Sequence, residues 1–198
     1  MLVKTYSSTV FGINATTITI EVNLEIGINF YLVGLPDNAV KESNIRIETA
    51  LKNNQFKIPG KKIVINMAPA DIKKEGSAYD LTLAIGILVA SGQIKADEID
   101  KYIIMGELSL DGGLQPIKGA LSIAIKAREE ILLGEKVNNV LVTGATGYIG
   151  SNLVRRLVSD HWCVHIIVRS SSNLEVLNAE SSIKESQANY FTALYNAL

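Results

Sequence analysis

The beginning of the chain has a strand pattern of hydrophobic and polar positions. Residues 2–34 are rich in Val, Ile, Thr, Tyr and Phe, and Gly12 and Gly27 interrupt them. This composition with two turn markers predicts three strands. In the run ATTITIEVNLEI, apolar side chains at every second position are expected to share one face. They are Ile18, Ile20, Val22, Leu24 and Ile26. The pattern predicts an antiparallel sheet with one covered face.

A helical pattern follows in residues 35–54. Pro36 is expected to open this helix, with Asp37 and Asn38 as N-terminal caps. Apolar residues then recur at helical spacing and form one stripe. The stripe consists of Val40, Ile47 and Leu51. We therefore expect one continuous amphipathic helix beside the sheet.

Four more elements are expected before residue 132. They are a strand at 61–67, an apolar helix at 81–92, a hairpin at 102–117 with its turn at Asp111-Gly112-Gly113, and a helix at 119–131. From residue 138 the order becomes strand, helix, strand, helix, which is typical of parallel βαβ units. This change of rhythm predicts a boundary near residues 133–138.

Composition narrows the classes of protein. With 198 residues, 47% of them hydrophobic, the chain can bury a core. A formal net charge of -1 and a pI near 6.1 argue against a globally basic nucleic-acid-binding surface. Because Cys163 is the single cysteine of the sequence, an intrachain disulfide is excluded. Cys163 lies in an apolar run, which is typical of a packed strand residue. The longest apolar helical stretch is about a dozen residues, short of the ~20 that span a bilayer. Without a signal-peptide pattern at the N-terminus, we expect a soluble, cytoplasmic protein.

Three blocks in the first region carry a family resemblance. They read GLPDNAVKESNIRIETALKNN, INMAPADIKKEGSAYDLTLAIGIL and GELSLDGGLQPIKGAL. In this order they resemble the N-terminal domain of magnesium-chelatase-like ATPases of the ComM/YifB type, over residues 1–130. The resemblance implies a Lon-protease-like domain of the ribosomal-protein-S5-domain-2 fold. It also implies an AAA+ ATPase ring as partner, DNA as an indirect partner in natural transformation, oligomers and no membrane.

Neither an ATPase nor a peptidase site is expected in this chain. A phosphate-binding loop needs the pattern G-x-x-x-x-G-K-[ST], which does not occur in the sequence. Lon-type peptidases use a serine activated by a lysine. By resemblance, the serine position is occupied by Ala78, with Ser77 one residue away, and the lysine position by Leu121. We expect Ser77 to cap the following helix instead.

The charged residues just before Ser77 are expected to form a solvated loop. They are Asp71, Lys73, Lys74 and Glu75. No metal site is expected from them or from other residues of the chain.

The stretch VLVTGATGYIG, at residues 140–150, has the form of a dinucleotide-binding turn. Gly144 allows a tight turn, Gly147 lets the backbone approach a pyrophosphate, and Gly150 lets the following helix pack on the strand. A phosphate there would face free N–H groups at the start of a helix. The other residues expected to line the turn are Thr146, Tyr148 and Ile149.

This tail resembles the N-terminal βαβ of extended short-chain dehydrogenases/reductases, the NAD-dependent epimerase/dehydratase family. In such folds an acid at the end of the second strand binds the ribose of NAD, but here Arg169 and Ser170 follow that strand. A cation and a hydroxyl suit a 2′-phosphate, so the expected cofactor is NADP(H), bound weakly or as a vestige. An ordinary surface arginine is the alternative. The family's Tyr-x-x-x-Lys pair is absent from the sequence, so hydride transfer is not expected.

The two resemblances together indicate a chimera. We expect an α/β chain in which a Lon-like α+β domain at residues 1–136 is followed by a truncated Rossmann-like βαβ at 137–198. Because a two-stranded fragment cannot cover its own apolar faces, we expect residues 139–143 to join or pack against the sheet of the first region. The alternative is two modules joined near residue 135. The function expected is that of a non-catalytic accessory domain, with an NAD(P)-binding dehydrogenase fragment, acting on nucleotide sugars, as the alternative.

Overall fold

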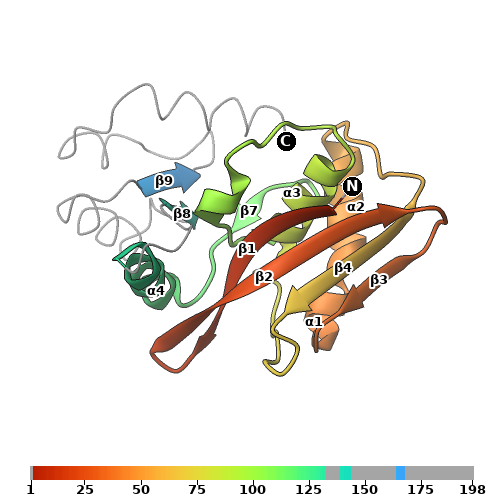
Figure 1. The fold of residues 1–198 in the computed structure, drawn as a ribbon. Coiled ribbons are helices and arrows are strands. Elements are labelled where there is room, and N and C mark those ends of the chain that lie inside the picture. Colours follow the sequence, from red (N-terminus) through yellow and green to blue (C-terminus); the bar gives the residue numbers. More distant parts are fainter. Residues whose placement is uncertain (1, 133–138, 144–163, 168–198) are drawn as a thin grey trace.

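The computed structural model describes residues 2–132, 139–143 and 164–167 (Figure 1). Its strands are β1 (Leu2–Phe11), β2 (Asn14–Glu25), β3 (Phe30–Val33), β4 (Lys62–Ala68), β5 (Tyr102–Ile103), β6 (Glu107–Leu108), β7 (Leu114–Gln115), β8 (Asn139–Thr143) and β9 (Val164–Ile167). Its helices are α1 (Asn38–Lys41), α2 (Ser43–Asn53), α3 (Asp80–Ala90), the 3-10 helix η1 (Ile99–Lys101) and α4 (Ala120–Leu132). The chain is therefore of the α/β class.

The main sheet is mixed. Its strands follow the order β3-β4-β2-β1-β5-β8-β9. Strand β2 pairs antiparallel with β1 and with β4, whereas all other neighbours are parallel. The prediction of an antiparallel sheet is thus correct for β1 and β2 and wrong for β3. Strand β4, which comes later in the chain, lies between β2 and β3, and apolar alternation says nothing about the order of strands.

The alternation in β2 predicts its buried face well. Ile18, Ile20 and Val22 are fully buried, and Leu24 packs against the same core. Ile26 is an exception, because β2 ends at Glu25 and the Ile26 side chain lies in the following turn, fully exposed. The period-2 pattern therefore continues one step beyond the strand.

The helix expected after Pro36 is divided into α1 and α2 at Glu42. Asp37 caps α1, since its Oδ1 accepts a hydrogen bond from Val40 N at 2.8 Å. Asn38 is the first helical residue rather than a cap, and Pro36 lies outside the helix in a bridge to the segment around residue 74. The predicted apolar stripe is confirmed, because Val40, Ile47 and Leu51 are buried.

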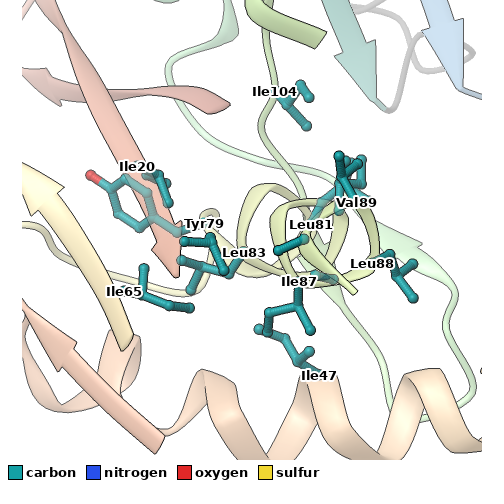
Figure 2. Close-up of a cluster of buried hydrophobic side chains, with 14 of the residues drawn as sticks. Ile20, Ile47, Ile65, Tyr79, Leu81, Leu83, Ile87, Leu88, Val89 and Ile104 are labelled. Carbon is teal, nitrogen blue, oxygen red and sulfur yellow. The ribbon is translucent and has the colours of Figure 1, made fainter. Parts of the chain in front are cut away.

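Helix α3 is the centre of the core. All eleven of its residues are buried, between the sheet on one side and α2 on the other. Figure 2 shows Leu81, Leu83 and Ile87 of this helix among side chains from the sheet and from α2. Gly86 allows the close approach to the sheet, because a Cβ atom there would lie 2.7 Å from Cγ2 of Val22.

The expected hairpin at residues 102–117 is shorter than predicted. Strands β6 and β7 form it, and its turn contains Gly112 with φ +87°, as expected for the Asp111-Gly112-Gly113 turn. Tyr102 and Ile103 instead form β5 of the main sheet, where Ile103 pairs with Tyr6 of β1. The apolar run before the hairpin is therefore a separate strand, and the chain leaves the sheet before the turn.

Strands β8 and β9 extend the main sheet. Tyr102 pairs with Asn139 and Ile103 with Val140, so residues 139–143 join the sheet of the first region as hypothesised. The boundary near residues 133–138 lies outside the described residues, and the division into domains 1–136 and 137–198 stays a prediction.

Helix α4 covers the face of the sheet opposite to α3. Thr17 of β2 donates a hydrogen bond from Oγ1 to Oε1 of Glu130 at 2.5 Å, whereas the neighbouring Ile18 faces the main core. Neighbouring residues of a strand point to opposite faces, so the sheet lies between two helical layers.

Within the described ranges, no helix is long and apolar enough to cross a membrane.

Candidate functional site

The three sequence blocks that carry the first resemblance meet at one place in the fold. The segment after β3 forms a bridge between Pro36 and Lys74. Asp37 N donates to Lys74 O at 2.9 Å, and Lys74 N donates to Leu35 O at 3.2 Å. The third block joins through Gly106, whose N–H donates to Ala78 O at 2.8 Å. We call residues 34–37, 69–80 and 106–108 the junction.

Asp37 connects the first two segments of the junction. Besides capping α1, its carboxylate accepts a hydrogen bond from Gly76 N at 3.2 Å. Because a carboxylate can accept several hydrogen bonds, one side chain satisfies donors from two segments far apart in sequence. The predicted helix cap therefore also holds the 69–80 loop in place.

Lys74 is buried at the centre of the junction, so the expectation of a solvated side chain is wrong for this residue. Its Nζ donates to Gly34 O at 2.8 Å and to Pro69 O. Burial lowers the pKa of the Lys74 ammonium, and the charge of Asp71 opposes this effect. Spacing in the sequence does not distinguish this lysine from its neighbour, because its partners are backbone carbonyls, one at the start of its own loop and one in the segment after β3.

The remaining charged residues of that loop behave as predicted. Lys73 and Glu75 form an exposed ion pair with Nζ and Oε1 2.6 Å apart, and Asp71 is exposed. Such surface pairs contribute little to stability. We assign them no chemical role.

Ser77 does not cap α3 with its side chain. Its hydroxyl donates to the Glu107 carboxylate, and the N-cap position of α3 is occupied by Tyr79, which makes no side-chain capping bond. The positions that match the peptidase residues hold Ala78, which is half-buried, and Leu121, which is exposed on α4. Among the described residues, the Ser77 hydroxyl thus bonds to an acid and not to a lysine that could activate a serine for attack.

A buried ion pair joins the junction to helix α2. Arg46 donates from Nε to Asp80 Oδ2 at 2.6 Å and from Nη2 to Asp80 Oδ1 at 3.0 Å. The Asp80 side chain is 0% exposed and that of Arg46 is 21% exposed. Arg46 Nη2 also donates to Ala39 O at 2.8 Å, while Asp80 Oδ2 accepts from Leu108 N at 3.3 Å.

This pair connects α1, α2, α3 and the β6–β7 hairpin. Burial raises the pKa of the Asp80 carboxyl, and the hydrogen bonds and charge of Arg46 oppose that shift. The same contacts hold the pKa of Arg46 above its ordinary value. Sequence reasoning missed both residues. The available signal is an aspartate at the start of the otherwise apolar segment DLTLAIGILVA, since buried acids are usually paired.

The predicted cofactor site lies outside the described residues. This holds for Gly144, Thr146, Gly147, Tyr148, Ile149, Gly150, Arg169 and Ser170. The two strands that precede these residues are described: β8 ends at Thr143 and β9 at Ile167, and these two residues are register partners in a parallel pair. The carboxyl ends of both strands therefore lie side by side. Parallel α/β sheets bind their ligands at the carboxyl ends of the strands.

In the part of the chain that the structure describes, no group of three or more His, Cys, Asp or Glu side chains could hold a metal ion.

Two family models match the chain. The model described as subunit ChlI of Mg-chelatase matches residues 20–138. The model of GDP-mannose 4,6 dehydratase matches residues 141–196. The two matches do not overlap, and both resemblances stated from the sequence are therefore confirmed as similarities of two separate segments.

Curated relatives agree with the first match. Protein YifB of Escherichia coli is 45% identical over 127 residues, which are 64% of this chain and 24% of YifB. Competence protein ComM of Haemophilus influenzae is 41% identical over 155 residues, which are 75% of this chain and 30% of ComM. Protein Rv2897c of Mycobacterium tuberculosis is 32% identical over 128 residues, which are 64% of this chain and 25% of Rv2897c. The chain thus spans about a quarter to a third of the relatives' length. Since the first family model covers more than half of the residues, the chain belongs to the family of subunit ChlI of Mg-chelatase.

Proposed function

We propose that the chain acts as a non-catalytic accessory domain of a magnesium-chelatase-like AAA+ ATPase that processes DNA during natural transformation. The observation that carries this proposal is the 41% identity to a protein named for competence, over three quarters of the chain. In this proposal residues 1–136 form a Lon-like domain of the ribosomal-protein-S5-domain-2 fold in the cytoplasm. Its direct partner is an ATPase ring, and DNA is the ring's substrate.

The contacts in the junction support an accessory role. Peptidase chemistry of the Lon type needs a free hydroxyl beside an amine that can take its proton. Here the Ser77 hydroxyl is bonded to Glu107, and the Lys74 ammonium is bonded to two backbone carbonyls. Both groups hold loops together, which supports structural roles for these two residues.

A domain exchange tests the proposed function. The segment of Haemophilus influenzae ComM that aligns with this chain is replaced by the aligned segment of this chain, in cells that lack their own ComM. We expect the hybrid to restore transformation frequency to within about tenfold of native ComM. A hybrid that accumulates to the native level without restoring transformation would contradict the proposal.

A matched variant of the hybrid separates an accessory role from a peptidase. Ser77→Ala removes only the bond to Glu107 and leaves the backbone bonds of the junction in place. We expect this hybrid to transform as well as the parent hybrid. Loss of transformation with unchanged protein level and unchanged melting temperature would indicate that the hydroxyl has a chemical role.

We propose a second function for the tail, namely weak binding of NADP(H) at the turn of residues 144–150. Two observations favour it: the match of residues 141–196 to GDP-mannose 4,6 dehydratase and the parallel pairing of β8 with β9. The backbone around Gly147 would approach the pyrophosphate, and Arg169 with Ser170 would contact the 2′-phosphate. Without the family's Tyr-x-x-x-Lys pair, this segment would bind the nucleotide and not reduce a substrate.

Calorimetric titration of the full chain with NADPH and with NADH tests the second function. We expect NADPH to bind at least fivefold more tightly, because only NADPH offers Arg169 a phosphate. Arg169→Ala should abolish the difference while leaving the melting temperature unchanged. If neither nucleotide binds at millimolar concentration, the second function is wrong and the first is unaffected.

A further inference from the structure

Strand β3 ends the main sheet on one side. It pairs with β4 in parallel, and among the described strands none pairs with its other edge. Ile63 N donates to Asn29 O at 2.8 Å. In a parallel ladder only alternate residues bond to the neighbouring strand, so Asn29, Tyr31 and Val33 face β4. The N–H and C=O groups of Phe30 and Leu32 therefore face the open edge.

The segment around β3 lacks the charged side chains that often protect such an edge. Residues 26–36, IGINFYLVGLP, contain no charged side chain. Natural edge strands are commonly protected by lysines, inward-pointing charges or bulges. This segment also contributes five of the twelve exposed large hydrophobic residues of the described part of the chain. They are Ile26, Ile28, Tyr31, Val33 and Leu35.

We propose that this edge pairs with the same edge of a second copy of the chain, with the two β3 strands antiparallel. The open N–H and C=O groups of Phe30 and Leu32 specify a strand as the occupant, because another backbone offers the complementary groups. A two-fold axis between the strands places each segment opposite itself. The main sheets of two copies then form one continuous sheet.

The charge pattern favours a second copy over an unlike partner. A charged peptide would find no counter-charge in residues 26–36. The segment meets its own copy without repulsion, and the exposed side chains of both copies are buried together. Ionic contacts nearby are already internal, since Lys62 Nζ lies 2.9 Å from Glu25 Oε2 and 5.4 Å from the Tyr31 ring centroid.

The expected dimer is weak and reversible. Stable complexes bury about 800 Å² on each partner. Strand β3 has four residues, and its flanking turns add only a few more side chains. The interface is therefore at the low end of the usual size range, where complexes are weak. We expect a dissociation constant on the order of 10 μM.

Analytical ultracentrifugation of the full chain at concentrations from about 1 to 100 μM tests the proposal. We expect a shift from monomer to dimer across this range. Val33→Lys and Ile28→Lys should each raise the dissociation constant at least tenfold, because each places two ammonium groups in the paired edge. Circular dichroism should show an unchanged fold for both variants, since the side chains are 48% and 88% exposed.

Ile13→Lys is the matched control. Ile13 is 87% exposed, like Ile28, but lies in the turn at the opposite end of β2. This variant should dimerise as the parent chain does. A synthetic peptide with the sequence of residues 27–36 should also compete and return the parent chain to monomer.

Three results would overturn the proposal. They are a chain that stays monomeric up to 100 μM, a dimer that survives both edge variants, and an Ile13→Lys variant that weakens the dimer as much as Ile28→Lys does. If Val33→Lys is unfolded, Ile28→Lys and the competing peptide decide, because Ile28 lies in a turn outside β3.

Discussion

Replacing Arg46 by methionine is expected to lower the free energy of unfolding by about 3 to 5 kcal/mol at neutral pH, because it leaves a buried carboxylate without its partner. Asp80 is fully buried and has two bonds from Arg46 but only one, at 3.3 Å, from the backbone of Leu108. Methionine retains much of the apolar stem of arginine, so the loss reports the charge rather than a cavity. Urea denaturation followed by circular dichroism measures it.

The loss should depend on pH in a defined direction. Burial raises the pKa of Asp80, and Arg46 opposes this shift. Without Arg46 the folded-state pKa rises further above the unfolded-state value. For a carboxyl group with a raised folded-state pKa, the stability is highest below the unfolded-state pKa and falls as pH rises through the folded-state pKa. The variant should therefore lose more stability at pH 8 than at pH 5.

The double variant Arg46→Met with Asp80→Asn provides the control. Asparagine carries no charge, so most of the pH-dependent part of the loss should disappear. If the single variant loses the same free energy at pH 5 and pH 8, the unpaired charge is not the cause. If the double variant is no more stable than Arg46→Met at pH 8, the lost contact to Ala39 O is the larger effect.

Local patterns were sufficient to predict most helices and strands. The alternation in β2 predicts Ile18, Ile20 and Val22 as buried, because side chains of a strand point alternately to its two faces. An uninterrupted apolar run likewise predicts the buried helix α3. Both predictions concern one element and its nearest layer, and that information is contained in a short window of sequence.

The arrangement of the junction could not be predicted in this way. Lys74 has its partners at Gly34 and Pro69, and Arg46 is 34 positions from Asp80 along the chain. The contact between Lys74 and Gly34 depends on β3 lying beside β4, which no periodicity specifies. Spacing alone therefore predicted a solvated lysine and gave no role to the ion pair. The family resemblance indicated the correct three blocks but not the contacts that join them.

Replacing Gly34 by alanine is expected to lower the free energy of unfolding by about 3 kcal/mol or more, which is roughly 10 °C in melting temperature for a chain of this size. Gly34 has φ +100°, a conformation that strains any residue with a Cβ atom. A Cβ atom there would also lie 2.1 Å from Met67 O, in the backbone of β4. Backbone cannot move aside as a flexible side chain can, so β3 must separate from β4.

Two other glycines divide this loss into its causes. Gly60→Ala changes a glycine outside the left-handed region with open space around it, and should have little effect. Gly92→Ala adds strain at φ +72° with no atom within 4 Å, and should cost about 1 kcal/mol. Only Gly34→Ala adds the clash with Met67 O, and it also displaces the carbonyl that accepts the Lys74 ammonium. In thermal unfolding, the loss of stability should therefore be smallest for Gly60→Ala, larger for Gly92→Ala and largest for Gly34→Ala. If Gly34→Ala loses no more stability than Gly92→Ala, the clash with Met67 O does not contribute to the loss.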